Sequence, residues 1–183
     1  ADGSASQLMK TNGSGVLSFV DAPASVDWTY GTEIANSSAT SIEFTSLPST
    51  ANQVDLFFTG MSFTGTVGAT TVIGDSGGYE TANYSGSSNN FENANQHTVG
   101  QSNSLWTMRT SNGASNSFHG VITVKRMDSS KFVYMQTHFL TLDGTTTTYM
   151  LGAGHKNLSA VLDRIKMSGG TFDGNSTFQI RYK

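Results

Sequence analysis

The sequence contains no cysteine and only two prolines among its 183 residues. The absence of cysteine excludes disulfide bonds, thiolate nucleophiles and thiolate zinc sites together, so stability must come from packing or assembly. Charged residues make up only 13% of the chain, which is too few to cover the wet faces of many surface helices. A helical bundle is therefore excluded.

The chain also lacks a basic region and a long apolar run. Its formal net charge is −3 and its ten Lys and Arg residues are scattered, so we expect no nucleic-acid partner. No apolar stretch approaches the ~18 residues of a membrane span, and the polar opening of residues 1–4 lacks the features of a signal peptide. We expect a soluble, non-secretory protein without membrane insertion.

Short apolar segments recur along the chain between clusters of Gly, Asn, Asp and Ser, as they do in β-sandwiches and barrels. Residues 120–127 and 131–140 are rich in β-branched and aromatic residues and flank a polar turn, which predicts a hairpin. Residues 54–63 are apolar on both alternating faces, which indicates a buried strand. Residues 177–182 alternate cleanly, which indicates a half-exposed strand.

Two further segments are less regular. In residues 157–167 apolar side chains recur at helical spacing, but the segment is short and runs into Gly169-Gly170, so a strand entering a turn is favoured. Residues 83–100 show neither period and predict a long surface loop. Together these patterns predict an all-β protein: an antiparallel β-sandwich of jelly-roll type over residues 31–183, preceded by an extended β-rich arm over residues 1–30.

The pentapeptide Gly74 to Gly78 (GDSGG) matches the sequence around the nucleophile of chymotrypsin-like serine proteases. In that family the general-base His and its Asp precede the nucleophile, whereas all four histidines of this chain follow Ser76. The favoured interpretation is a Gly-rich turn in which Asp75 and Ser76 bond the local backbone.

Other catalytic and metal-binding patterns are missing from the sequence. The histidines have no metal-ligand spacing, and no Gly-rich segment carries the Lys of a phosphate loop. A two-carboxylate glycosidase site needs no sequence proximity, but nothing selects a pair, and the acids lie mostly beside turn formers. Asp55 is the exception, and strand alternation turns it away from its apolar neighbours. We expect no enzyme activity, no cofactor and no metal ion.

Several aromatic residues fall in polar, Asn-rich sequence and outside strand alternation. This mixture is typical of sugar binding, in which a ring stacks on the pyranose face and amides bond the hydroxyls. The alternative is that the same rings cap the open ends of the sandwich. The candidate ligand-binding residues are Tyr79, Tyr84, Asn89, Asn90, Phe91, Asn95 and Trp106.

Residues 1–19 (ADGSASQLMKTNGSGVLSF) resemble a segment that recurs in tail-fibre and other virion proteins of tailed bacteriophages. Residues 42–48, the strand of residues 56–60, residues 73–81 with Tyr84, and residues 172–182 follow the pattern of a C-terminal domain often attached to that segment, so the resemblance covers nearly the whole chain. The resemblance also implies that residues 74–78 form a structural turn typical of this virion domain. The long anchoring and shaft region of fibres is missing, which fits either a fragment with a fibre tip or a small complete virion protein.

The resemblance implies a virion-surface protein, made in the host cytoplasm, that contacts other virion proteins. It also implies a homotrimer, because the phage segment typically occurs in trimers. An arm of ~25 residues cannot bury its apolar positions alone, so we expect Leu8, Val16, Leu17 and Phe19 to pack between copies. The implied function is non-enzymatic, tail-fibre-like adhesion to host surface carbohydrate. The alternative is a capsid decoration or cement protein that stabilises the virion without binding a ligand.

Overall fold

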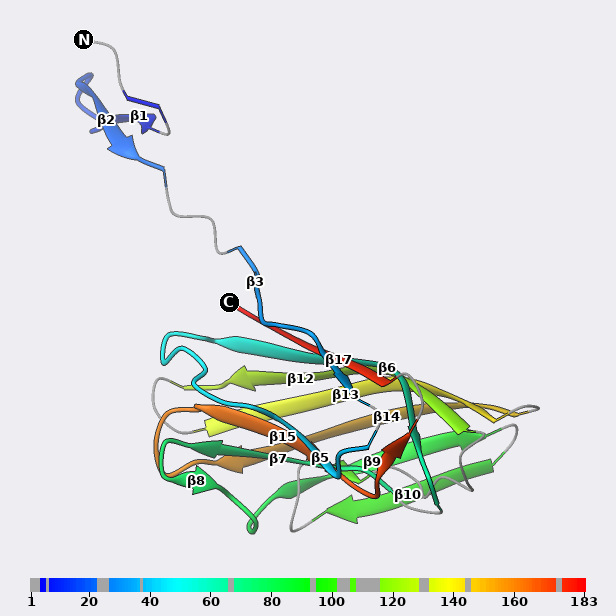
Figure 1. The fold of residues 1–183 in the computed structure, drawn as a ribbon. Helices are drawn as coiled ribbons and strands as arrows, with labels where there is room; N and C mark the ends of the chain where they lie inside the picture. Colours follow the sequence, from blue (N-terminus) through cyan, green and yellow to red (C-terminus); the bar gives the residue numbers. More distant parts are fainter. Residues whose placement is uncertain are drawn as a thin grey trace.

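The computed structural model of this chain consists of two packed β-sheets and a separate N-terminal hairpin (Figure 1). It describes residues 4–5, 7–22, 27–36, 38–65, 68–92, 95–101, 106–107, 116–128, 132–143, 146–173 and 176–183. Every regular element within these ranges is a β-strand, and the strands pair antiparallel. The predicted all-β, antiparallel sandwich is confirmed, while its jelly-roll connectivity stays a prediction.

The large sheet has ten strands, in the order β10-β9-β14-β13-β12-β6-β17-β3, with β16 paired to β6 and β4 to β17. Strand β6 (Gln53–Phe63) lies between β12 (Asn116–Arg126) and β17 (Ser176–Tyr182). The other strands are β3 (Thr29–Tyr30), β4 (Ile34–Asn36), β9 (Ser85–Glu92), β10 (Asn95–Gln101), β13 (Phe132–Asp143), β14 (Thr146–Asn157) and β16 (Phe172–Asp173).

The small sheet has five strands, in the order β11-β7-β15-β5, with β8 paired to β7. Its strands are β5 (Ser41–Phe44), β7 (Thr70–Asp75), β8 (Gly78–Tyr79), β11 (Trp106–Thr107) and β15 (Arg164–Ser168). In β5 and β15 buried apolar residues alternate with more exposed polar ones, so one face of this sheet meets the core and the other meets solvent.

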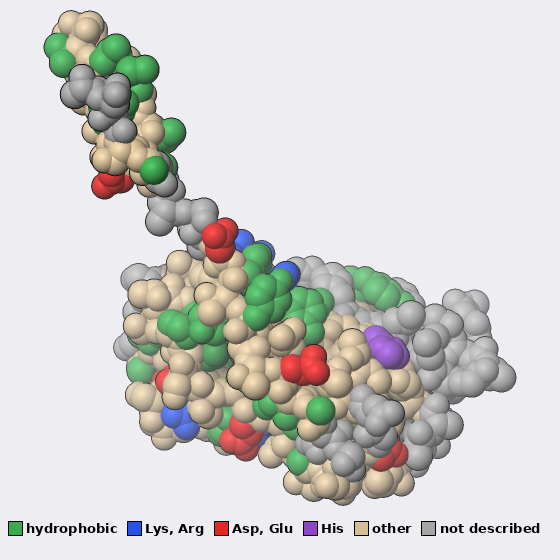
Figure 2. Space-filling view, turned by 45° about the horizontal axis from the view of Figure 1, so that its top comes forward, with side chains coloured by type: hydrophobic (Ala, Val, Ile, Leu, Met, Phe, Trp, Pro, Cys, Tyr) green, Lys and Arg blue, Asp and Glu red, His purple; other side chains and the backbone are tan. Residues whose placement is uncertain are grey.

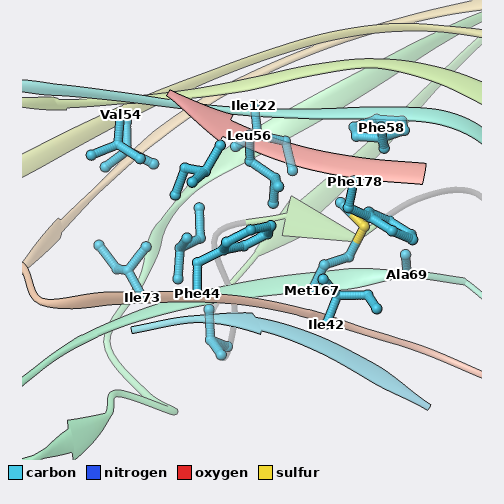
Figure 3. Close-up of a cluster of buried hydrophobic side chains, with 14 of the residues drawn as sticks. Ile42, Phe44, Val54, Leu56, Phe58, Ala69, Ile73, Ile122, Met167 and Phe178 are labelled. Atoms are coloured by element: carbon cyan, nitrogen blue, oxygen red, sulfur yellow. The ribbon is translucent and has the colours of Figure 1, made fainter. Parts of the chain in front are cut away.

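The core fills the space between the two sheets (Figure 3). Val54, Leu56 and Phe58 alternate along β6 and are completely buried, and they face Ile73 of β7 and Met167 of β15 from across the sandwich. Burial of one such side chain contributes about 1.5–3 kcal/mol. A chain without disulfides can therefore take its stability from this layer.

A β-bulge bends β6 near its end. The pairing of β6 with β12 shifts between Phe118 and Gly120, so that two residues of β6 stand opposite His119. One of them is Gly60, which has a φ of 60° and donates its backbone N–H to Nδ1 of His119 at 3.3 Å. Glycine suits this left-handed position because it has no Cβ. After the bulge Met61 is again fully buried.

Several strand predictions are confirmed. The predicted hairpin of residues 120–127 and 131–140 is β12 and β13, which pair from Arg126 with Val133 onwards. The predicted buried strand of residues 54–63 is β6. Residues 177–182 lie in β17, where buried Phe178 and Ile180 alternate with the half-buried Thr177, Gln179 and Arg181. The less regular segment of residues 157–167 runs into strand β15, as favoured.

The predicted surface loop over residues 83–100 is wrong. Strands β9 and β10 form a hairpin in this segment, and β9 also pairs with β14, so the hairpin extends the large sheet. Pairing with β14 supplies the backbone hydrogen bonds for a Ser- and Asn-rich sequence of low strand propensity. The close approach also requires glycine at Gly86, where a Cβ would lie 2.7 Å from the Ala153 carbonyl oxygen.

The N-terminal hairpin consists of β1 (Gln7–Thr11) and β2 (Leu17–Asp21) and stands away from the sandwich (Figures 1 and 2). In its loop, the side-chain oxygen of Asn12 accepts the backbone N–H groups of Ser14 at 2.8 Å and Val16 at 3.2 Å. The sandwich itself begins inside the predicted arm, because β3 already pairs with β17.

Candidate functional site

Tyr84 lies in the core and is not available to a ligand. Its ring is only 4% exposed, and its hydroxyl donates to the carbonyl of Glu80 at 2.8 Å and accepts the N–H of Ile73 at 3.1 Å. Burial raises the pKa of Tyr84 to about 12. The prediction that Tyr84 binds a ligand is therefore wrong, because this side chain ties the segment after β8 to β7.

Tyr79 lies on the solvent-facing side of the small sheet. It pairs with Gly74, where a Cβ would lie only 2.0 Å from the Gly78 carbonyl oxygen, so β7 must lack a side chain at that point. The Tyr79 hydroxyl donates to Glu43 at 3.2 Å, and Lys166 Nζ lies 4.2 Å from the ring centroid. Burial, together with the neighbouring Glu43 carboxylate, raises the pKa of Tyr79. The half-buried ring is held by charged groups of its own sheet.

The other candidate residues come from three neighbouring strands. Asn89, Asn90 and Phe91 lie on β9, and Asn95 begins β10. Trp106 begins β11, which contacts both β9 and β10. Asn89 is half-buried, while the side chains of the other four lie outside the described residues. The fold thus brings the backbones of these candidates together. Trp106 belongs to the small sheet, as Tyr79 does, but it pairs with Thr71 at one end of β7, while Tyr79 pairs with Gly74 near the other.

The GDSGG segment forms the tight turn between β7 and β8. Asp75 pairs with Gly78, which leaves Ser76 and Gly77 as the two turn residues. Gly78 has a φ of 142°, in the region that favours glycine, and the Asp75 carboxylate accepts the Gly77 N–H at 2.7 Å. The interpretation of this segment as a turn is confirmed.

A polar cluster that the sequence analysis missed lies behind this turn. We call it the Asp75 cluster, and it comprises Asp75, Glu80, Lys156 and Ser159. The Ser159 hydroxyl donates to Asp75 and lies 3.3 Å from Glu80 Oε1, while Lys156 Nζ lies 3.2 Å from Glu80 Oε2. Asp75 and Lys156 are buried. No local motif joins positions so far apart in the chain, so only the fold reveals the cluster.

The chemistry of the Asp75 cluster favours a structural role. The hydrogen bond from Ser159, aided by the Gly77 backbone N–H, lowers the pKa of Asp75. A serine nucleophile needs a neighbouring base that accepts its proton near neutral pH, and a carboxylate with a lowered pKa is a poor one. The cluster instead links the β7–β8 turn to the segment that follows β14.

A second cluster lies where the N-terminal arm meets the sandwich, and we call it the arm-root cluster. The Arg181 guanidinium donates to the buried Asp55 at 2.9 Å and lies 4.0 Å from the ring centroid of Trp28. Lys183 Nζ lies 4.6 Å from the same ring. These cation–π contacts and the pairing of β3 with β17 fix the first residues of the sandwich. Trp28 was not among the predicted residues, because a lone tryptophan has no sequence signal for this role.

The predicted assembly residues of the hairpin are all exposed, and two further apolar residues join them. The exposed fractions are 53% for Leu8, 64% for Met9, 58% for Val16, 64% for Leu17, 43% for Phe19 and 37% for Val20. Figure 2 shows these apolar groups on the part of the molecule that stands away from the sandwich. A single copy therefore leaves the hairpin without a core.

Among the described residues, no three His, Asp or Glu side chains come close enough to hold a metal ion. The same part of the chain contains no helix with the length and apolar character needed to cross a bilayer. In comparisons with known proteins, no family model, curated protein or solved structure matches this chain.

Proposed function

We propose that this chain is a tail-fibre-like module of a bacteriophage virion surface that assembles as a homotrimer and adheres to host surface glycans without enzyme activity. The observation that carries the proposal is the N-terminal hairpin, whose large apolar side chains lie in solvent in a single copy. A dense exposed apolar surface of this kind marks a contact with another protein chain. The phage resemblance of residues 1–19 covers β1 and the first three residues of β2.

The mass of the full chain in solution tests the assembly. We expect three chains per particle at micromolar concentration, and a shift to single chains in Leu17→Asp, which places a charge among the apolar groups. Met127→Asp is the matched control, because Met127 is also highly exposed, at 60%, but lies after β12. A wild-type particle of 19.4 kDa would contradict the proposal.

The adhesion surface in this proposal is the part formed by β9, β10 and β11. These adjacent strands carry Asn89, Asn90, Phe91, Asn95 and Trp106, a set that combines amides with aromatic rings. Amides bond sugar hydroxyls, and rings offer an apolar face to a pyranose. Tyr84 has no part in this surface because it is buried.

Binding to purified host polysaccharide tests the adhesion. We expect Phe91→Ala and Trp106→Ala each to weaken binding about fivefold or more, as central aromatic contacts do. Met127→Ala, with equal thermal stability, is the control variant. If Phe91→Ala and Trp106→Ala both bind as tightly as the wild type and the control do, the glycan surface does not lie on these strands.

Binding without turnover is part of the proposal. Asp55, the acid with apolar neighbours in sequence, has both carboxylate oxygens engaged, one by Gln53 at 3.0 Å and one by Arg181 at 2.9 Å. Neither oxygen is then left for a glycosidic bond. We expect no new reducing ends after incubation with host capsular polysaccharide or lipopolysaccharide. Release of such ends, lost on substitution of a single carboxylate, would contradict this part.

The second candidate function is capsid decoration, in which the protein cements the virion and binds no ligand. The burial of Tyr84 and the engagement of Tyr79 by charged neighbours favour it, since a cement protein needs no exposed sugar-binding rings. Labelling of virions for cryo-electron microscopy separates the two functions. The label will lie at the tail tip if the protein is a fibre module, and on the capsid if it is a decoration protein.

A further inference from the structure

Strand β14 presents one side to solvent from Tyr149 onwards. Exposed side chains alternate there with buried ones, as expected of a strand with one face on the core and the other in water. Tyr149 is 44% exposed and Leu151 is 37% exposed. Ala153 and His155 continue the same side and are also exposed. This side of β14 is therefore a mainly apolar stripe that begins with an aromatic ring.

The neighbouring strand β9 places a polar stripe beside the apolar one. The β9 residues that pair with alternate positions of β14 from Leu151 to His155 are, in that order, Asn89, Ser87 and Ser85. Directly paired residues share a face of a sheet, and neighbouring strands lie ~4.8 Å apart. Ser85 and Ser87 are exposed, and Asn89 is half-buried. Hydroxyl and amide groups thus line the apolar stripe on one side.

The two stripes carry no acidic or basic side chain of Asp, Glu, Lys or Arg. We call them the β14–β9 surface, which comprises Tyr149, Leu151, Ala153, His155, Ser85, Ser87 and Asn89. Lys125 lies on β12, and the whole of β13 separates that strand from β14, a distance of about 10 Å. Arg181 and Asp55 lie farther across the same sheet and bind each other. A charged ligand would therefore find no counter-charge on the β14–β9 surface.

The small side chains of this surface do not suit a protein partner. Ser and Ala are depleted at protein interfaces, where large aromatic side chains are enriched. On the β14–β9 surface Ala153, Ser85 and Ser87 leave the face low, and the large apolar side chains are Tyr149 and Leu151. The surface runs for ~20 Å along β14. It has the length to take a chain of several sugar units and the open form to let that chain lie flat.

We propose that the β14–β9 surface is the glycan-contacting surface of this protein and that its ligand is an uncharged stretch of polysaccharide. This inference rests on the adhesion proposed above and names its site and its ligand class. A pyranose presents an apolar face and a rim of hydroxyl groups. Tyr149 and Leu151 take the apolar face, and the serine hydroxyls and the Asn89 amide bond the rim.

Tyr149 supplies the exposed ring that the sequence analysis expected from other tyrosines. Tyr84 is buried, and Tyr79 is held by charged groups of the small sheet. Tyr149 pairs with Phe91, and Leu151 pairs with Asn89. The surface is therefore continuous with two of the residues that the sequence analysis selected.

Calorimetric titration of the full chain with purified host polysaccharide tests the site. The polysaccharide is first separated by anion exchange into neutral and acidic fractions, and we expect binding to the neutral one. Tyr149→Ala should weaken this binding about tenfold, as the loss of a central aromatic contact does. Tyr149→Phe keeps the ring and should bind within about threefold of wild type. Tyr30→Ala is the control, because Tyr30 is 57% exposed but lies on β3, at the far edge of the same sheet.

A second variant tests the polar stripe. Ser87→Glu places a long charged side chain among the hydroxyl groups, and we expect it to weaken binding about tenfold. Ser76→Glu is its control, since Ser76 is also exposed but lies in the turn between β7 and β8. Thermal unfolding checks that all variants are folded. Because the contact involves no charge pair, wild-type binding should change less than about twofold between about 0.05 M and about 1 M salt.

The outcomes separate this inference from the adhesion on which it rests. Binding to the neutral fraction that is weakened in both Tyr149→Ala and Ser87→Glu supports the inference. Binding that survives in either variant, binding to the acidic fraction alone, or binding abolished by salt overturns the inference and leaves the adhesion standing. Binding to neither fraction overturns both. A fall in particle mass in Tyr149→Ala would show that a second copy covers this surface, and would also overturn the inference.

Discussion

The Asp75 carboxylate joins two segments of the chain through three hydrogen bonds. It accepts the Gly77 N–H within its own turn, the Ser159 hydroxyl from the segment after β14, and the backbone N–H of Ala160. Because these donors stabilise the charged form, the pKa of Asp75 lies below its ordinary value of 3.8. The resulting stability is present above pH 3.8 and is lost as the pH falls through the lowered pKa.

We therefore expect Asp75→Asn to lower the free energy of unfolding at neutral pH, and its difference from wild type to shrink as the pH falls below 3.8. Hydrogen bonds to a charged group contribute about 1.5–3 kcal/mol, which sets the scale of the loss at neutral pH. Urea unfolding at a series of pH values measures both effects. Glu33→Gln, at an exposed acid before β4, is the control. A difference that stays constant with pH would contradict the role given to Asp75.

Tyr84 offers a second test at the residue scale. Tyr84→Phe keeps the ring but leaves the buried N–H of Ile73 without the hydroxyl as its acceptor. We expect a loss of about 1–3 kcal/mol in the free energy of unfolding. Tyr79→Phe removes a more exposed hydroxyl and should cost clearly less. The ultraviolet titration adds a check, since burial raises the pKa of Tyr84 to about 12 and should delay its ionisation relative to exposed tyrosines.

At the scale of elements, the positions of apolar residues in the sequence predict a strand well where those residues are buried in the fold. Strand β6 has apolar residues on both faces because Val54, Leu56 and Phe58 enter the core while Phe57, on the other face, lies 4.8 Å from the Arg181 guanidinium. Strand β17 alternates because one of its faces is buried. Strands β9 and β10 were missed because their Ser-, Asn- and Gln-rich sequence shows no apolar alternation, while their backbones pair at the end of the sheet. Pairing between distant segments leaves no local pattern.

The same limit applies to the candidate site. The segment of residues 74–78 was identified as a turn because the positive φ that calls for glycine is a property of a few consecutive residues. The burial of Tyr84 and the contacts of Trp28 instead depend on residues far away in the chain. The hairpin register, once known, assigns the exposed residues to two faces. The length of the arm, its apolar positions and the phage resemblance predicted only that Leu8, Val16, Leu17 and Phe19 pack between copies.

The glycines paired between β9 and β14 provide a test at this scale. A Cβ on Gly154 would lie 2.6 Å from the Ser85 carbonyl oxygen, so Gly154→Ala should push the two strands apart. We expect a loss of about 1–3 kcal/mol, as for other overpacked positions. The loss should be accompanied by weaker glycan binding, since β9 is displaced. Gly65→Ala, where a Cβ meets nothing within 4 Å, should change neither quantity.

At the scale of the whole molecule, the sandwich contains its own core and the hairpin contains none. Folding of the sandwich should therefore not depend on assembly. We expect a chain lacking residues 1–21 to stay monomeric and to keep its β-sheet circular dichroism, because the arm-root cluster that fixes β3 is retained. Loss of structure on this truncation would show that the hairpin supports the sandwich directly.

Under the proposed function, the separation of the hairpin from the sandwich would affect the strength of attachment to a cell (Figure 1). Copies joined only at their hairpins would carry three identical binding surfaces on one particle, and once the first surface is bound the other two are held near the cell at a high effective concentration. Such avidity can exceed the single-site affinity by about 10²–10⁴ without any new contact. Each surface can then be weak and exchange quickly, so a particle could move across a cell surface without leaving it.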